Sequence, residues 1–221
     1  MPITNPEYVA QYREIHATTR YGADCHKLFH LHVLACIVDL KPKSILEFGC
    51  GQSQLYQTLD LEGIEYHRYD PAIPEIAELK VKQADFIINT DVMEHILTAD
   101  VEDVLSTLAG ISNCVFFNLA TRPAGKVLKN GENAHCTVWS AKKWLQEIRK
   151  HFPDANLQTE VHPGSCNILT WKSKVNPLIE ALERQRVEAK KRAKAQKKPD
   201  HLLKKVERSV RKVRNKIIGK K

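Results

Sequence analysis

The chain has 221 residues, of which 43% are hydrophobic, and a formal net charge of +8. It contains no run of 18 apolar residues, which excludes a membrane-spanning helix, and its mean hydropathy of −0.39 is typical of a globular domain with a polar segment. Six cysteines are scattered without a CxxC pair, so we expect reduced cytoplasmic thiols and neither a disulfide framework nor a zinc knuckle.

The first 40 residues are predicted to contain two helices. Asn5 and Pro6 suit the cap and first turn of a helix over 7–17. Residues 1–6 have no basic region before an apolar core, so we expect no signal peptide. A second helix, over 26–40, has apolar residues around more than one side, which indicates that it is buried.

A glycine-rich turn follows the first predicted strand. The apolar run 45–48 ends in Gly49-x-Gly51, a helix begins near Ser53, and a second strand over 64–69 ends in Asp70. This order is typical of a nucleotide-type site at the carboxyl edge of a parallel sheet. Glycine permits the sharp turn and the close approach of a ligand, and an acid suits the hydroxyls of a ribose.

A second group of polar residues follows the next strand, over 85–90. Asn89, Thr90 and Asp91 stand at its carboxyl end, beside the expected glycine turn. Only 14 residues separate Asp70 from this strand, so we expect an abbreviated third-strand region, with a vestigial strand near 79–81.

Strands and helices alternate through the rest of the globular part. We expect a helix over 101–108, a strand over 113–119, a long loop over 120–138, a helix from Ser140 to 151, and two strands over 157–161 and 167–171. The alternation predicts an α/β fold with a Rossmann-like, mostly parallel sheet and helices on both faces.

Two motifs resemble those of the class I S-adenosylmethionine-dependent methyltransferases. Glu47, Gly49 and Gly51 match motif I, and Asp91-Val92-Met93-Glu94-His95-Ile96 is similar to motif IV and the turn after it. The resemblance covers residues 20–171 and implies S-adenosylmethionine as cofactor. The residues expected to contact the cofactor are Glu47, Gly49, Cys50, Gly51, Asp70, Asn89, Thr90 and Asp91. The candidate catalytic bases are His135, Glu94 and His95, with His162 as a further candidate.

A narrower resemblance concerns a metal. Asp91, Glu94, His95 and His135 resemble the metal-binding residues of the methyltransferases that modify the ribose 2′-hydroxyl at the end of small RNAs. Such a set would hold Mg²⁺ or Mn²⁺. Core packing and helix capping explain the same residues without a metal, so both interpretations stay open.

The excess positive charge lies in a C-terminal tail. Residues 172–221 contain 19 Lys or Arg and 5 Asp or Glu, which leaves a net charge of −6 for the rest. We therefore predict a methyltransferase domain over 1–173 and a basic helical extension over 174–221. Its second helix, over 200–218, has an apolar stripe: Leu203, Val206, Val210, Val213 and Ile217.

The tail allows several partners. The basic amphipathic helix suits an anionic membrane surface, RNA or a partner helix, and a solvated tail is the alternative. The lack of aromatic residues beyond 172 favours the membrane. We expect a cytoplasmic enzyme, peripheral at the inner face of a membrane, that methylates a hydroxyl of a glycan or another small or lipid-linked acceptor. The alternatives are RNA ribose 2′-O-methylation and a non-catalytic cofactor-binding scaffold that acts through its tail.

Overall fold

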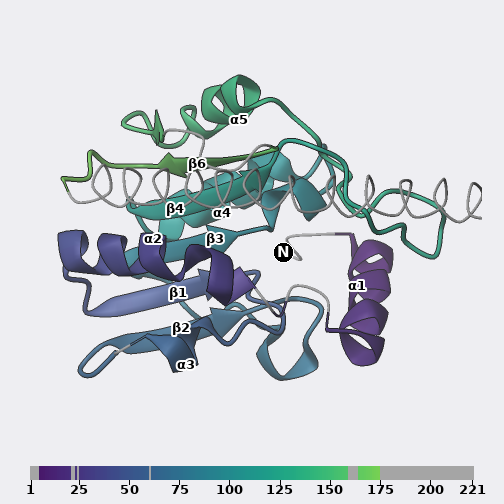
Figure 1. Cartoon of the computed structure of the whole chain (residues 1–221), viewed down its shortest axis with the longest axis horizontal. Coiled ribbons are helices and arrows are strands. Elements are labelled where there is room, and N and C mark those ends of the chain that lie inside the picture. The colour runs from purple at the N-terminus through teal and green to yellow at the C-terminus, as the bar shows by residue number, and fades with distance from the viewer. Residues whose placement is uncertain (1–4, 21–22, 24, 60, 159–163, 175–221) are drawn as a thin grey trace, which may run out of the picture. The chain divides into compact units, whose positions relative to one another are not determined.

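The computed structural model describes residues 5–20, 23, 25–59, 61–158 and 164–174 (Figure 1). The elements in chain order are α1 (Pro6–Thr18), α2 (Cys25–Leu40), β1 (Ser44–Phe48), α3 (Leu55–Thr58), β2 (Glu65–Tyr69), η1 (Pro74–Ile76), β3 (Phe86–Thr90), η2 (Met93–His95), α4 (Val101–Ile111), β4 (Val115–Ala120), α5 (Ala141–Ile148), β5 (Asn156–Leu157) and β6 (Ser165–Leu169). Apart from the region near 79–81, each predicted helix and strand within the described residues is present, with shifted ends.

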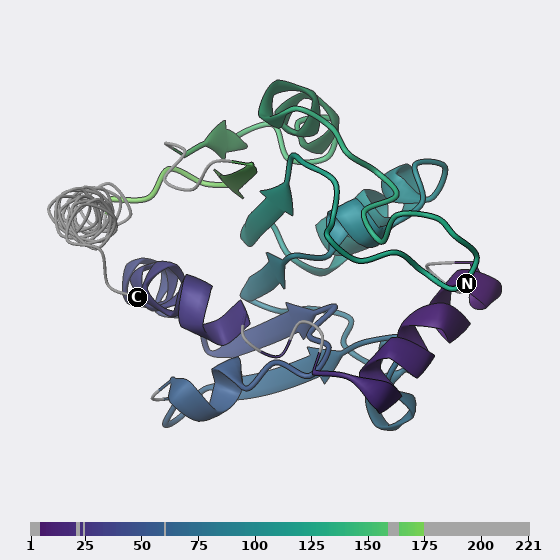
Figure 2. The same cartoon turned by 45° about the vertical axis from the view of Figure 1, so that its right-hand side comes forward.

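The strands form one sheet in the order β2-β1-β3-β4-β6-β5. Strands β1 to β4 are parallel, whereas β6 runs antiparallel to β4 and β5 antiparallel to β6. The carboxyl ends of the parallel strands therefore meet at one edge, and α1 stands across that edge (Figures 1 and 2). The α/β, Rossmann-like prediction is confirmed.

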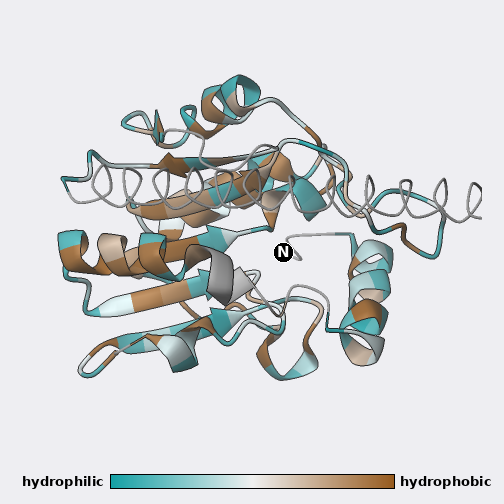
Figure 3. Ribbon diagram, viewed as in Figure 1, coloured by the Kyte–Doolittle hydropathy of each residue, from teal (hydrophilic) through white to brown (hydrophobic). Residues whose placement is uncertain are grey.

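Helices cover both faces of this sheet. Successive residues of a strand point to opposite faces, so Ile88 of β3 packs with Val33 of α2, whereas Ile87 packs with Leu105 of α4. All four side chains are fully buried, which stabilises each by about 1.5–3 kcal/mol relative to exposure. Because β1, β3 and β4 are covered on both faces, they are apolar along most of their length (Figure 3).

Strand β2 is an edge of the sheet, and no strand forms between Tyr69 and Phe86. The prediction of a vestigial strand near 79–81 is wrong. The Asp70 carboxylate accepts a hydrogen bond from the Ala72 amide at 2.8 Å, and the short helix η1 follows in place of an extended segment. Leu79 and Val81 then pack against the core as irregular chain.

The tail lies outside the described residues. The predicted helices beyond 174, the domain boundary at 173 and the contacts of the tail with a membrane, RNA or a partner helix therefore stay predictions. None of the helices in the described part of the chain is long and apolar enough to cross a membrane.

Candidate functional site

The glycine turn after β1 is held by the end of β2. The amides of Gly49 and Cys50 both donate to the Tyr69 carbonyl oxygen, at 2.8 and 3.1 Å. The Gly51 amide donates to Asp70 Oδ2 at 2.8 Å. Gly49 and Gly51 have φ values of +72° and +48°, which favour glycine because other residues meet a steric penalty there.

The space beside Gly49 is filled by protein. A Cβ at Gly49 would lie 2.6 Å from Cγ1 of Val92, in the turn after β3. The missing side chain of Gly49 therefore lets the two predicted motifs pack together. Its role as a cofactor contact stays a prediction.

Glu47, in β1, and Cys50, in the glycine turn, are both buried. The Tyr66 hydroxyl donates to Glu47 Oε2 at 3.0 Å, and the Glu47 side chain is only 3% exposed. Burial raises the pKa of the Glu47 carboxyl, against hydrogen bonds from Ser53 and Tyr66 that lower it. Burial likewise raises the pKa of the Cys50 thiol, which is therefore inert.

A cavity of about 940 Å³, counting its open mouth, lies at this edge of the sheet. Its wall includes predicted residues from both motifs: Glu47, Gly49, Cys50, Gly51, Asp70, Thr90, Asp91 and His95. Asn89 is absent from the wall and fully buried within the sheet. The cavity brings the glycine turn, the acid after β2 and the end of β3 together.

Helix α1 contributes cavity residues that the sequence analysis missed. Tyr8, Tyr12 and His16 line the wall from this helix. They stand four residues apart, so they share one face of the helix. The four-residue spacing of these three rings was the signal available in the sequence.

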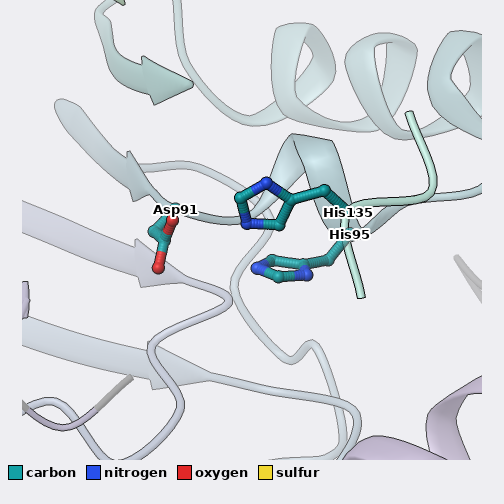
Figure 4. A group of neighbouring side chains, drawn as sticks. All are labelled: Asp91, His95 and His135. Carbon is teal, nitrogen blue, oxygen red and sulfur yellow. The ribbon is translucent and has the colours of Figure 1, made fainter. Parts of the chain in front are cut away.

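Asp91, His95 and His135 form a compact group of three possible metal ligands. One ligand atom from each lies within 4.8 Å of the other two, and both imidazole rings project toward Asp91 (Figure 4). Asp91 has a φ of +59°, a left-handed conformation that aspartate tolerates better than most residues. The chain therefore turns sharply directly after β3, at the residue that contributes the carboxylate to this group.

Backbone carbonyls fix the tautomers of both histidines. His95 Nδ1 lies 2.8 Å from the Ala134 oxygen, and His135 Nδ1 lies 2.7 Å from the Arg122 oxygen. A carbonyl oxygen only accepts, so each Nδ1 carries the hydrogen and, in the neutral ring, the lone pair is on Nε2. Metal-binding histidines are usually held by such a bond.

The loop with His135 is fastened to the turn with His95. The Thr137 amide donates to the Glu94 carbonyl at 3.0 Å, and the Thr137 hydroxyl donates to the Ile96 carbonyl at 2.7 Å. Asn133 Oδ1 accepts from the His135 amide at 2.9 Å. The two Thr137 bonds bring two segments about 40 residues apart in sequence into one site.

Glu94 lies in the core beneath this group. Its side chain is 0% exposed, and Oε1 accepts from the Ala120 amide at 2.6 Å. Burial raises the pKa of Glu94 well above its ordinary value, and the neighbouring charge of Asp91 raises it further. Its full burial, outside the wall of the cavity, argues against Glu94 as a general base. His162 lies outside the described residues.

The donor set fits a divalent cation. One carboxylate oxygen and two imidazole nitrogens suit Mn²⁺ and other first-row metals better than Ca²⁺, which prefers oxygen ligands throughout. Burial lowers the pKa of His95, which favours the neutral ring that a metal requires. Asp91, His95 and His135 are thus the residues that would hold such an ion.

No model of a protein family and no curated protein matches the chain. Among solved structures, 1,6-didemethyltoxoflavin N1-methyltransferase of Burkholderia thailandensis, with bound 1,6-didemethyltoxoflavin and S-adenosylhomocysteine, is 11% identical at a TM-score of 0.51. The match covers 76% of this chain and 90% of that one.

Two further structures resemble the chain less closely. The small RNA methyltransferase HEN1 is 9% identical at a TM-score of 0.48, over 65% of this chain and 25% of that one. An O-methyltransferase family protein of Burkholderia thailandensis is 11% identical at 0.49, over 75% and 64%. The chain thus spans about a quarter of the HEN1 chain. Its fold is that of the class I S-adenosylmethionine-dependent methyltransferases.

Proposed function

We propose that the chain transfers a methyl group from S-adenosylmethionine to a sugar hydroxyl, beside a divalent cation held by Asp91, His95 and His135. The main observation that supports this proposal is that Asp91 and His95 line the same cavity as Gly51 and Asp70. A donor site and an acceptor site that share one wall are what a direct transfer needs. The solved neighbour with bound S-adenosylhomocysteine supports the choice of donor.

The donor side is built for a ribose and a methionine moiety. Each oxygen of the Asp70 carboxylate accepts one backbone amide and has a second lone pair for a ribose hydroxyl. Such charge-assisted bonds are stronger than neutral ones. Val92 and Ile96 supply apolar wall for the rest of the cofactor. S-adenosylmethionine supplies an activated methyl group on a sulfonium.

The acceptor side orients an oxygen nucleophile. Its oxygen forms a bond to the methyl carbon in line as the carbon–sulfur bond breaks, and the hydroxyl proton passes to water. A bound divalent cation supplies positive charge that lowers the pKa of the hydroxyl. We therefore propose His95 and His135 as ligands and not as bases, with Glu94 as a buried support that accepts the Ala120 amide.

For the identity of the acceptor we keep the prediction made from the sequence, which is a hydroxyl of a glycan or of another small or lipid-linked molecule. That choice depends on the basic tail, which lies outside the described residues. The scaffold alternative is the outcome in which the cofactor binds without any transfer.

A ribose 2′-hydroxyl of RNA is the second candidate. The resemblance of Asp91, Glu94, His95 and His135 to the ligands of small-RNA methyltransferases favours it. Arg122 and Lys126 are exposed on the loop that carries His135, where a phosphate of the acceptor would find opposite charge. One assay distinguishes the two candidates, because it recovers RNA and glycans in separate fractions.

The assay follows a labelled methyl group from S-adenosylmethionine into extract separated into RNA, glycan, lipid and small-molecule fractions. We expect label in a sugar-containing fraction, its loss after EDTA and its recovery with Mn²⁺. The variant tested in this assay is His135→Ala. Its control is His151→Ala, which removes a histidine that is paired with Glu102. No label in any fraction, with cofactor binding intact, would leave the scaffold alternative.

A further inference from the structure

Helix α1 contacts both halves of the proposed site. At its C-terminal end, the Gln52 side chain donates to the His16 carbonyl, and a Cβ at Gly51 would lie 3.2 Å from the His16 ring. In the middle of the helix, Tyr12 reaches His95. The helix therefore connects the glycine turn with the proposed metal ligands.

The Tyr12 hydroxyl completes a triangle of polar atoms. It donates to the Ala134 carbonyl at 2.7 Å and lies 3.0 Å from His95 Nδ1, which is itself 2.8 Å from the same carbonyl. The hydroxyl hydrogen is used on the carbonyl, so Nδ1–H is the donor toward both oxygens. The opposite tautomer would place the Nδ1 lone pair against the carbonyl oxygen.

The Tyr12 ring restrains the His95 ring as well. The two rings meet edge to face with centroids 5.4 Å apart, and the His95 and His135 rings meet in the same way at 4.8 Å. Tyr12 is thus packed against one proposed ligand and bonded to the segment that precedes the other. Its loss would loosen the ring whose Nε2 belongs to the three-residue group.

We propose that Tyr12 is a positioning residue, which holds the His95 ring in the orientation that a divalent cation requires, so that the docking of α1 completes the metal site. This inference rests on the proposed function. The inference makes the metal site dependent on α1, which is far from the proposed ligands in sequence. Outer partners of metal ligands typically contribute about 10- to 100-fold to metal affinity.

The first test compares Mn²⁺ binding to Tyr12→Phe and wild type by electron paramagnetic resonance. Phenylalanine keeps the ring contact and removes the hydroxyl, so we expect about tenfold weaker Mn²⁺ binding. Tyr56→Phe removes a hydroxyl that bonds only Gln57 among the described contacts, and it should bind Mn²⁺ as wild type does. Equal Mn²⁺ affinity of Tyr12→Phe and wild type would overturn the proposal.

The second test needs no metal. Proton–nitrogen NMR correlations of the histidine rings report which nitrogen carries the hydrogen, and the His95 signals are those missing in His95→Gln. We expect the Nδ1–H form in wild type, since the Ala134 carbonyl accepts that hydrogen, and altered His95 Nδ1–H signals in Tyr12→Phe, which lacks the second oxygen beside it. Unchanged His95 signals in Tyr12→Phe would overturn the role of Tyr12, whereas a wild type that binds no Mn²⁺ would instead refute the metal in the proposed function.

Discussion

Oδ2 of Asp70 accepts a hydrogen bond from the backbone amide of Gly51 at 2.8 Å, so the residue after β2 fixes the turn after β1. The two residues are 19 positions apart in sequence and meet because β1 and β2 are parallel neighbours. The donor half of the site is therefore held in shape by the sheet itself. A site held in this way loses little conformational entropy when a ligand binds.

Gly49→Ala should destabilise the protein more than the same substitution at another glycine with a similar backbone conformation. Gly63 has a φ of +74°, and a Cβ there would have no neighbour within 4 Å, whereas a Cβ at Gly49 would meet Val92 at 2.6 Å. Both variants share the backbone penalty, so Gly49→Ala should cost about 1–3 kcal/mol more than Gly63→Ala because of overpacking. Urea unfolding measures this difference.

A double-mutant cycle identifies Val92 as the cause. Val92→Ala should restore part of the stability lost in Gly49→Ala, although it costs stability in the wild type, since Val92 is buried. Strictly additive effects of the two substitutions would contradict the packing explanation and leave only backbone strain.

Glu47→Gln should change how stability depends on pH. The pKa of Glu47 is raised in the folded protein by burial, so above the unfolded pKa the folded state binds more protons than the unfolded state. Wild-type stability therefore falls as pH rises from about 4.3 through the raised pKa. Glutamine does not titrate, so the stability of Glu47→Gln relative to wild type should rise over that window. A difference that does not vary with pH would contradict the assignment.

His135→Ala should weaken Mn²⁺ binding strongly. The variant removes one of three proposed ligands, so the loss should reach or exceed the range of about 10- to 100-fold seen for outer partners. His151→Ala removes a histidine that is bonded to Glu102 and is not one of the proposed ligands, so this control should bind Mn²⁺ normally. Titration after EDTA treatment and dialysis measures both, and an unaltered affinity of His135→Ala would remove this residue from the site.

The fold could be predicted because its signals are local. Asn5 accepts from the Glu7 amide and Ser140 from the Lys143 amide, and each begins a helix where the sequence places a cap. Buried parallel strands show as apolar runs in the same way. The prediction near 79–81 is wrong because Leu79 and Val81 are partly buried as irregular chain, and alternating apolar residues alone resemble a strand.

The site could be predicted only in part. The glycine turn, Asp70 and the end of β3 follow from strand order, because the carboxyl ends of parallel strands meet. The contact of Tyr12 with His95 joins residues 83 positions apart, and no local pattern indicates it. Glu94 was a candidate base because it follows the strand that ends in Thr90 and lies next to His95, but the turn of η2 directs it into the core.

Calorimetric titration with S-adenosylhomocysteine tests the central claim most directly. We predict binding to one site in wild type, binding weaker by about 10- to 100-fold in Asp70→Ala because charge-assisted bonds of about 1.5–3 kcal/mol are lost, and normal binding in Glu78→Ala, which removes an exposed carboxylate paired with Lys80. No binding to wild type, or equal binding to folded Asp70→Ala, would contradict the assignment of this cavity to the methyl donor.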